Sequence, residues 1–184
     1  MKADSGLEQF FRAAEVLLAE NGPGPDTFAS VGSMLRPLAA DPTLADPSRL
    51  TALHDSSAGF TILGHGPRGS TLMLGRFPAE APTPVHNHNS WGVIHVVRGR
   101  DRHILWARDD DGSQPGRARL RVVESRELSP GDTLWFPDVP DDIHSQQGIG
   151  GDAWELVYFA RDPTARPRLY FDPQRGLVEE RLPV

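Results

Sequence analysis

Two histidines stand two residues apart in the segment Pro84-Val-His-Asn-His-Asn-Ser-Trp-Gly, and this spacing is the first sign of metal chemistry. On a β-strand, side chains two positions apart project from the same face, so His86 and His88 can point their imidazoles at one place. A third histidine follows in Asp141-Asp-Ile-His-Ser. The pattern predicts a metal site with three imidazole ligands, from His86, His88 and His144.

The charge of the predicted ligand set suggests the kind of reaction. Three neutral imidazoles leave the full charge of a divalent ion uncompensated, which favours an anionic ligand such as a thiolate or an enolate. They also leave coordination positions open for a substrate and dioxygen. Imidazole accepts zinc, nickel, copper and iron alike, so the ligand types alone leave the metal undetermined.

Four further residues are predicted to serve the site. Arg76, within an apolar segment, is a candidate clamp for a substrate carboxylate. Trp91 and His95 are candidate substrate contacts, and Tyr158 is the predicted catalytic proton donor. For each of them the competing interpretation is a structural role, on the outer face of a strand or in the core.

Two helices are predicted ahead of the strands that would carry these residues. A capping box of Ser5 and Glu8 opens the first, and Asn21-Gly22 ends it. The second covers residues 28–39. We expect residues 1–57 to form an N-terminal helical segment of the same domain, packed outside a barrel formed by residues 58–184.

Short apolar runs bounded by Gly, Pro or Asp follow from about residue 58 and predict strands. About eight such runs with no helices between them favour a jelly-roll barrel. The predicted strands are residues 60–64, 70–77, 91–97, 103–107, 120–123, 133–136, 153–159 and 169–171.

The two histidine segments resemble the two-part motif of the cupin superfamily, an H-x-H strand ending in a Gly turn and a later G-D…P…H strand. This resemblance implies a mainly β cupin double-stranded β-helix (jelly-roll) barrel. Many cupins carry a glutamate ligand shortly after the H-x-H pair, whereas residues 89–93 of this chain contain no acid. The matching residues are His86, His88, Gly99, Gly131, Asp132, Pro137 and His144.

A three-histidine cupin without that glutamate is similar to the cysteine dioxygenase family of thiol dioxygenases, in particular its bacterial 3-mercaptopropionate-type members. The metal segment from Pro84 and the tail segment Phe171-Asp-Pro-Gln-Arg-Gly carry the resemblance, which spans roughly residues 58–178. It implies an Fe(II) cofactor, dioxygen as co-substrate, and oxidation of a small thiol acid to its sulfinate.

The chain departs from that family at two places. The family usually carries a Ser-x-His-x-Tyr run on a late strand, where this chain has Trp154-Glu-Leu-Val-Tyr. In one register of this strand, Tyr158 occupies the position of the family's tyrosine. In the register shifted by one residue, Glu155 points into the barrel. Ile62 stands where the cysteine-using members carry an arginine for the substrate carboxylate. A thiol acid other than cysteine, or a non-thiol substrate, fits these differences better.

The amino-acid composition and net charge limit the kinds of partner that the protein can have. With 25 acidic against 19 basic residues, the net charge of −6 argues against a nucleic-acid partner. The chain has no cysteine, its start lacks a secretory signal, and no apolar stretch is long enough for a membrane helix. We expect a cytoplasmic protein with a small thiol and dioxygen as partners, as a monomer or a homodimer.

Two other functions remain compatible with the sequence. A Zn, Ni or Mn cupin that acts as an isomerase, decarboxylase or hydrolase would use the same three imidazoles without dioxygen. A non-enzymatic small-molecule-binding cupin would keep the site without turnover.

Overall fold

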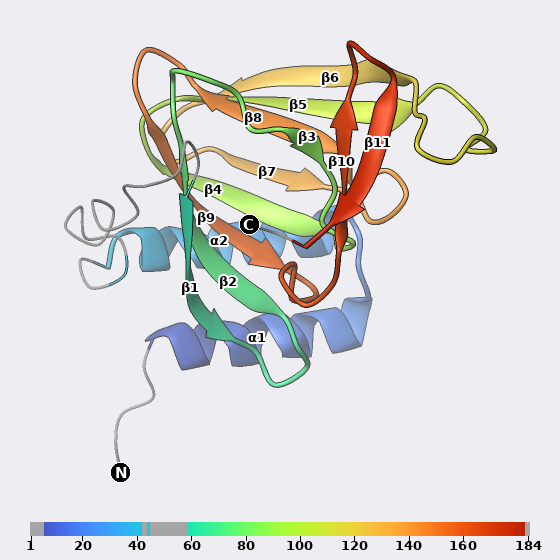
Figure 1. The fold of residues 1–184 in the computed structure, drawn as a ribbon. Helices are drawn as coiled ribbons and strands as arrows, with labels where there is room; N and C mark the ends of the chain where they lie inside the picture. Colours follow the sequence, from blue (N-terminus) through green and yellow to red (C-terminus); the bar gives the residue numbers. More distant parts are fainter. Residues whose placement is uncertain (1–5, 42–43, 45–58, 183–184) are drawn as a thin grey trace.

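The computed structural model describes residues 6–41, 44 and 59–182, which form two helices and then eleven strands (Figure 1). Ser5 of the predicted capping box and the boundary between residues 57 and 58 lie outside the described residues. The elements are α1 (Gly6–Asn21), α2 (Pro25–Ala39), β1 (Gly59–His65), β2 (Thr71–Phe77), β3 (Val85–His86), β4 (Gly92–Arg98), β5 (Asp101–Arg108), β6 (Leu120–Leu128), β7 (Thr133–Phe136), β8 (His144–Gly148), β9 (Ala153–Phe159), β10 (Arg168–Asp172) and β11 (Leu177–Arg181).

The strands form two sheets, with the orders β1-β2-β9-β4-β7 and β11-β10-β3-β8-β5-β6. All the pairings are antiparallel, and strands distant in sequence become neighbours, as where β9 lies between β2 and β4. Figure 1 shows the sheets facing each other, with both helices beyond the five-stranded sheet. The predicted mainly β jelly-roll fold with N-terminal helices outside is therefore confirmed.

The helices attach to the outer face of the five-stranded sheet through an apolar core. Phe10, Phe11 and Ala14 of α1 are buried at helical spacing, as the sequence predicted. A Cβ atom on Gly32 of α2 would lie 2.3 Å from Thr133 Cγ2, so a glycine is needed for α2 to approach β7 this closely. Neither described helix is both long enough and apolar enough to cross a bilayer.

The three inner strands of the five-stranded sheet, β2, β9 and β4, are largely buried on both faces, and residue alternation decides which core each side chain joins. On β2, Leu72 and Leu74 pack toward the helices, whereas Met73 packs between the two sheets. On β9, Leu156 and Tyr158 face the helices. Because side chains alternate with a period of two, every prediction about the site depends on the strand register.

The eight predicted strands are all present, but three short strands were missed. β3 has two residues and β8 has five, mostly polar, so neither carries the apolar run that signals a strand. β11 is mostly exposed and polar as well. The two missed strands β3 and β8 carry His86 and His144.

Candidate metal centre

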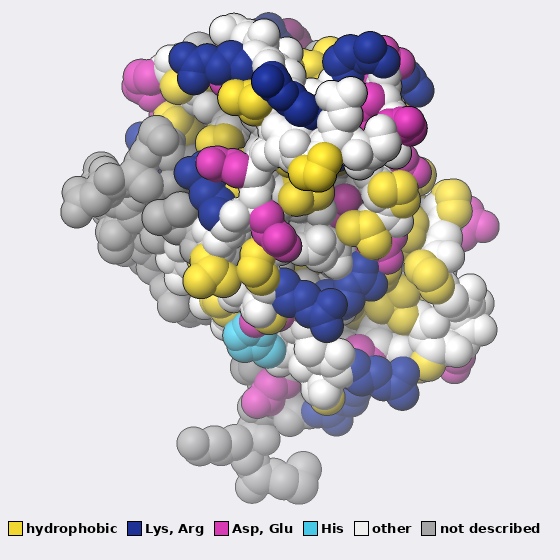
Figure 2. Space-filling model, turned by 45° about the vertical axis from the view of Figure 1, so that its right-hand side comes forward, with side chains coloured by type: hydrophobic (Ala, Val, Ile, Leu, Met, Phe, Trp, Pro, Cys, Tyr) yellow, Lys and Arg dark blue, Asp and Glu magenta, His cyan; other side chains and the backbone are white. Residues whose placement is uncertain are grey.

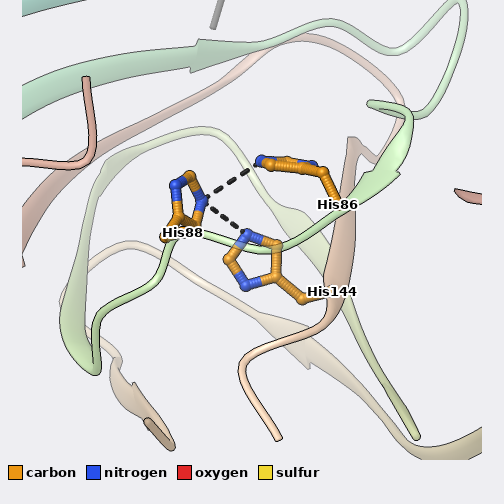
Figure 3. Close-up of side chains that lie close together, drawn as sticks. All are labelled: His86, His88 and His144. Carbon is orange, nitrogen blue, oxygen red and sulfur yellow. Dashed lines mark hydrogen bonds between the residues drawn. The ribbon is translucent and has the colours of Figure 1, made fainter. Parts of the chain in front are cut away.

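The three predicted ligands meet inside the barrel (Figure 3). His86 ends β3 and lies opposite His144, the first residue of β8, in the sheet. The sequence suggested that His88 lies on the same strand as His86. In the structure, His88 lies in the loop that follows β3. Its Nε2 atom lies 3.1 Å from His86 Nε2 and 3.0 Å from His144 Nε2.

The protonation of the histidines suits metal binding. His86 Nδ1 lies 2.8 Å from the carbonyl oxygen of Pro84, to which a protonated Nδ1 donates, leaving the Nε2 lone pair for a metal ion. Burial lowers the pKa of His86 to about 4, and burial also lowers the pKa values of His88 and His144 well below 6.5. The three imidazoles are therefore neutral at pH 7.

Two of the three nitrogen–nitrogen separations fit one ion, and the three ligand atoms all lie within 4.8 Å of one another. Metal–nitrogen bonds of about 2.0–2.1 Å place two ligand nitrogens about 3.0–3.4 Å apart, depending on the coordination angle. The observed separations of 3.0 and 3.1 Å agree with this. Among the described residues, no carboxylate joins the group of His86, His88 and His144. The centre can thus hold a divalent ion on neutral ligands alone.

A cavity of about 270 Å³ opens onto the histidines. Its walls are largely apolar, and β2, β7 and β9 of the five-stranded sheet supply one side of them. A cavity of this size accepts a small ligand and brings it against the Nε2 atoms. The apolar wall includes Met73, Phe77, Phe136, Val157 and Phe159.

One side of the cavity is cationic. Arg168 on β10 is buried, with 6% of its surface exposed, and its Nε donates to the carbonyl oxygen of Pro163 at 2.8 Å. Arg181 lies at the rim, with its Cζ 4.0 Å from the ring centre of Tyr170. The Tyr170 ring stacks on His86, with ring centres 5.8 Å apart. An anionic group in the cavity would therefore meet guanidinium groups beside the metal ligands.

A buried acid pair lies deeper in the barrel. Gln146, which lines the cavity, donates from Nε2 to Glu155 Oε2 at 2.6 Å and to Asp101 Oδ2 at 3.3 Å. Burial raises the pKa of Asp101 to about 7, and burial followed by the nearby Asp101 raises the pKa of Glu155 well above 4.5. Of the two registers considered for the late strand, the structure has the one in which Glu155 points inward.

The four predicted residues beyond the histidines lie on the other face of the five-stranded sheet. Tyr158 packs against Phe10 of α1, with ring centres 5.6 Å apart, and Trp91 packs in the same core. Arg76 pairs with Asp152 at 2.7 Å. The predicted roles of Tyr158, Trp91 and Arg76 at the histidines are corrected accordingly, because none of them lines the cavity.

His95 needs the same correction. Its Nδ1 lies 3.1 Å from Thr133 Oγ1, on the side of β4 where Val93 packs against the helices. The neighbouring Ile94 and Val96 are the residues that face the second sheet. The apolar sequence of β4 concealed this, because a strand buried on both faces shows no apolar–polar alternation.

Sequence reasoning missed the cavity residues of the other sheet. Arg168 lay outside the predicted strand of residues 169–171, yet it is the first residue of β10. Arg168 and Tyr170 are two positions apart, so on a strand they share a face, and this spacing was the available signal.

On the face shown in Figure 2, basic, acidic and hydrophobic side chains are intermingled.

Comparisons with known proteins support the fold and no more. No family model and no curated protein matches the chain. Among solved structures, the DMSP lyase DddQ from Ruegeria pomeroyi DSS-3 is 14% identical, with a TM-score of 0.51, over 94% of this chain and 99% of that one. An RmlC-like cupin from Ralstonia eutropha JMP134 is 18% identical, with a TM-score of 0.43, over 70% of each chain.

Oxalate oxidase in complex with glycolate is 21% identical, with a TM-score of 0.45, over 58% of this chain. The matched part spans about half of the oxalate oxidase chain, at 52%. The DddQ match, which extends over nearly the whole of both chains, shows a shared fold at an identity too low to transfer an activity. The chain therefore shares a jelly-roll fold with DddQ.

Proposed function

We propose that this protein is a metal-dependent oxygenase that uses Fe(II) and dioxygen to oxidise a small thiol acid to its sulfinate. The observation that carries the proposal is the meeting of three neutral imidazoles with a buried arginine in one small, mostly apolar cavity. The reaction balances without another reductant, since a thiolate and dioxygen combine and both oxygen atoms end on sulfur.

Charge is the first support for a thiol acid. A divalent ion on His86, His88 and His144 keeps both its positive charges, and Arg168 adds a third in a buried environment. Such a site favours a ligand that binds with two negative charges, because uncompensated buried charge is costly. A thiolate at one end and a carboxylate at the other supply these charges in a small molecule.

The shape and polarity of the cavity are the second support. The guanidinium of Arg168 matches a carboxylate, which it can hold through paired N–H donors. The apolar wall, including Phe77 and Phe159, would contact the methylene groups of the ligand and exclude water. Arg168 takes over the role that the sequence assigned to Arg76.

Iron at this centre would supply open coordination positions for a thiolate and dioxygen, together with redox chemistry at the metal. The side chains around the centre would position the metal and the bound ligand. His86, held by Pro84, keeps its Nε2 aimed at the metal position. Tyr170, beside His86 in the cavity wall, places a phenol where it could donate a hydrogen bond to the bound ligand.

A second candidate is a metal-dependent lyase, isomerase or hydrolase that uses no dioxygen. Tyr170 favours it, because a phenol next to a Lewis-acidic centre suits proton transfer to or from a substrate. Oxygen consumption separates the two candidates, since only the first requires it.

The test is oxygen uptake by protein reconstituted anaerobically with Fe(II). We expect uptake with 3-mercaptopropionate or a close homologue and none with 3-hydroxypropionate, which lacks the thiol. His144→Ala should lose both bound iron and uptake. His95→Ala, on the far face of the sheet, should keep both. Iron bound stoichiometrically by the wild type with no thiol-dependent uptake would overturn the proposal in favour of the second candidate.

A further inference from the structure

The two asparagines that alternate with the metal histidines hold the strand that carries Arg168. Asn87 is buried, and its Oδ1 accepts the backbone N–H of Leu169 at 2.8 Å. The backbone N–H of Asn87 donates in turn to the carbonyl oxygen of Leu169 at 3.1 Å. Asn87, between two metal ligands, is therefore bonded twice to the residue that follows Arg168.

Asn89 holds the residue on the other side of Arg168. Its Nδ2 donates to the carbonyl oxygen of Pro167 at 2.9 Å. Asn89 has a φ of 57°, in the left-handed region that asparagine tolerates better than most residues. Asn87 Nδ2 also donates to Asn89 Oδ1 at 3.2 Å, so the two amides are linked. Together they bracket Arg168 from both sides.

These contacts are needed because the backbone pairing ends early. β3 pairs with β10 through His86 and Val85 only, opposite Tyr170 and Phe171. Beyond His86 the chain leaves the sheet. The contacts of Asn87 and Asn89 with Leu169 and Pro167 then keep the segment that contains His88 attached to the segment that contains Arg168. The Nε of Arg168 donates to the carbonyl oxygen of Pro163.

We propose that Asn87 and Asn89 are positioning residues that set the distance between the three-histidine centre and Arg168, and so select the length of the acid that binds. This inference rests on the proposed function, in which the ligand spans from the metal to Arg168. A ligand held at both ends in a rigid site has one favourable length, because displacement of either end costs binding.

The experiment measures binding without turnover. Co(II)-substituted protein is titrated anaerobically with mercaptoacetate, 3-mercaptopropionate, 4-mercaptobutyrate and 1-propanethiol, and thiolate binding is followed by its charge-transfer absorption. The variants are Asn87→Ala and Asn89→Gly, since glycine keeps the left-handed backbone accessible while removing the amide. Asn21→Ala, at the end of α1, is the matched control.

We expect the wild type and Asn21→Ala to prefer one acid length by at least 10-fold. In Asn87→Ala and Asn89→Gly the preference should fall below 3-fold, while affinities for Co(II) and 1-propanethiol change less than 3-fold. In an Arg168→Met background, the asparagine substitutions should have no further effect on acid binding.

A length preference retained in both variants would overturn the inference. Equal losses for 1-propanethiol and the acids, or a parallel loss of Co(II), would overturn it too, since they indicate general damage to the centre. Wild-type Co(II) protein that binds no thiol of any kind would overturn the proposed function, and this inference with it.

Discussion

Metal binding is expected to be almost independent of pH from pH 8 down to about 5.5, because the ligand imidazoles stay neutral throughout this range. A metal ion competes with protons for imidazole lone pairs. Burial lowers the pKa of His86 to about 4 and keeps the pKa values of His88 and His144 well below 6.5. A fall in pH therefore weakens binding only when it approaches these lowered values.

The size of the effect follows from the same values. At pH 5.5, an ordinary histidine with a pKa of about 6.5 is protonated in roughly ten molecules of eleven, so three such ligands would lose roughly 1,000-fold in affinity. That loss corresponds to about 4 kcal/mol. With a pKa of about 4, His86 is protonated in only a few per cent of molecules at pH 5.5, so its protonation lowers the metal affinity by only a few per cent.

The assay is competition for Zn(II) between the apoprotein and a chelator, at pH 8.0, 7.0, 6.0 and 5.5, corrected for protonation of the chelator. The chain unfolded in urea is the control, since its histidines have ordinary pKa values. We expect less than a 3-fold change for the folded protein. A loss near 1,000-fold between pH 8.0 and 5.5 would refute the reasoning, because it would mean that the buried histidines are protonated in the apoprotein.

Three other predictions concern single residues. Arg168→Met should weaken 3-mercaptopropionate binding to the Co(II) protein by about 3 kcal/mol, roughly 150-fold, and 1-propanethiol by less than 3-fold; equal losses would contradict the carboxylate assignment. Because Asp101 and Glu155 have raised pKa values, the folded state keeps protons that the unfolded chain releases, so stability falls as pH rises toward about 7. Urea unfolding of Glu155→Gln should show a smaller decline than the wild type between pH 5 and 8, and equal declines would argue against a buried acid pair. Tyr158→Phe should keep thiol-dependent oxygen uptake within 2-fold, and a loss of more than 10-fold would place its hydroxyl in the reaction.

Several structural features were predictable from local patterns. The helices follow from the spacing of Phe10, Phe11 and Ala14, and the long strands follow from apolar runs between turn residues. The histidine set was predictable because an H-x-H pair and a later histidine form a motif in the sequence itself. The structure groups the three histidines as predicted, although β3 and β8 were missed, since the motif does not depend on strand length.

The faces of the strands were not predictable from local patterns. On β4 and β9 almost every residue is apolar or buried, so alternation could not show whether His95 and Tyr158 point toward the helices or into the barrel. The choice was decided by α1 and α2, which cover the outer face and bury it. The same register turned Glu155 inward, where Gln146 meets it.

The sequence by itself determined the class of fold and the set of three histidines, because residue types and short spacings carry this information. Only the tertiary structure decided which residues accompany them. Arg168 lines the same cavity as the histidines because β10 pairs with β3, a contact between segments more than 80 residues apart. Pairing over such a distance depends on the packing of the whole barrel, which no local pattern in the chain expresses.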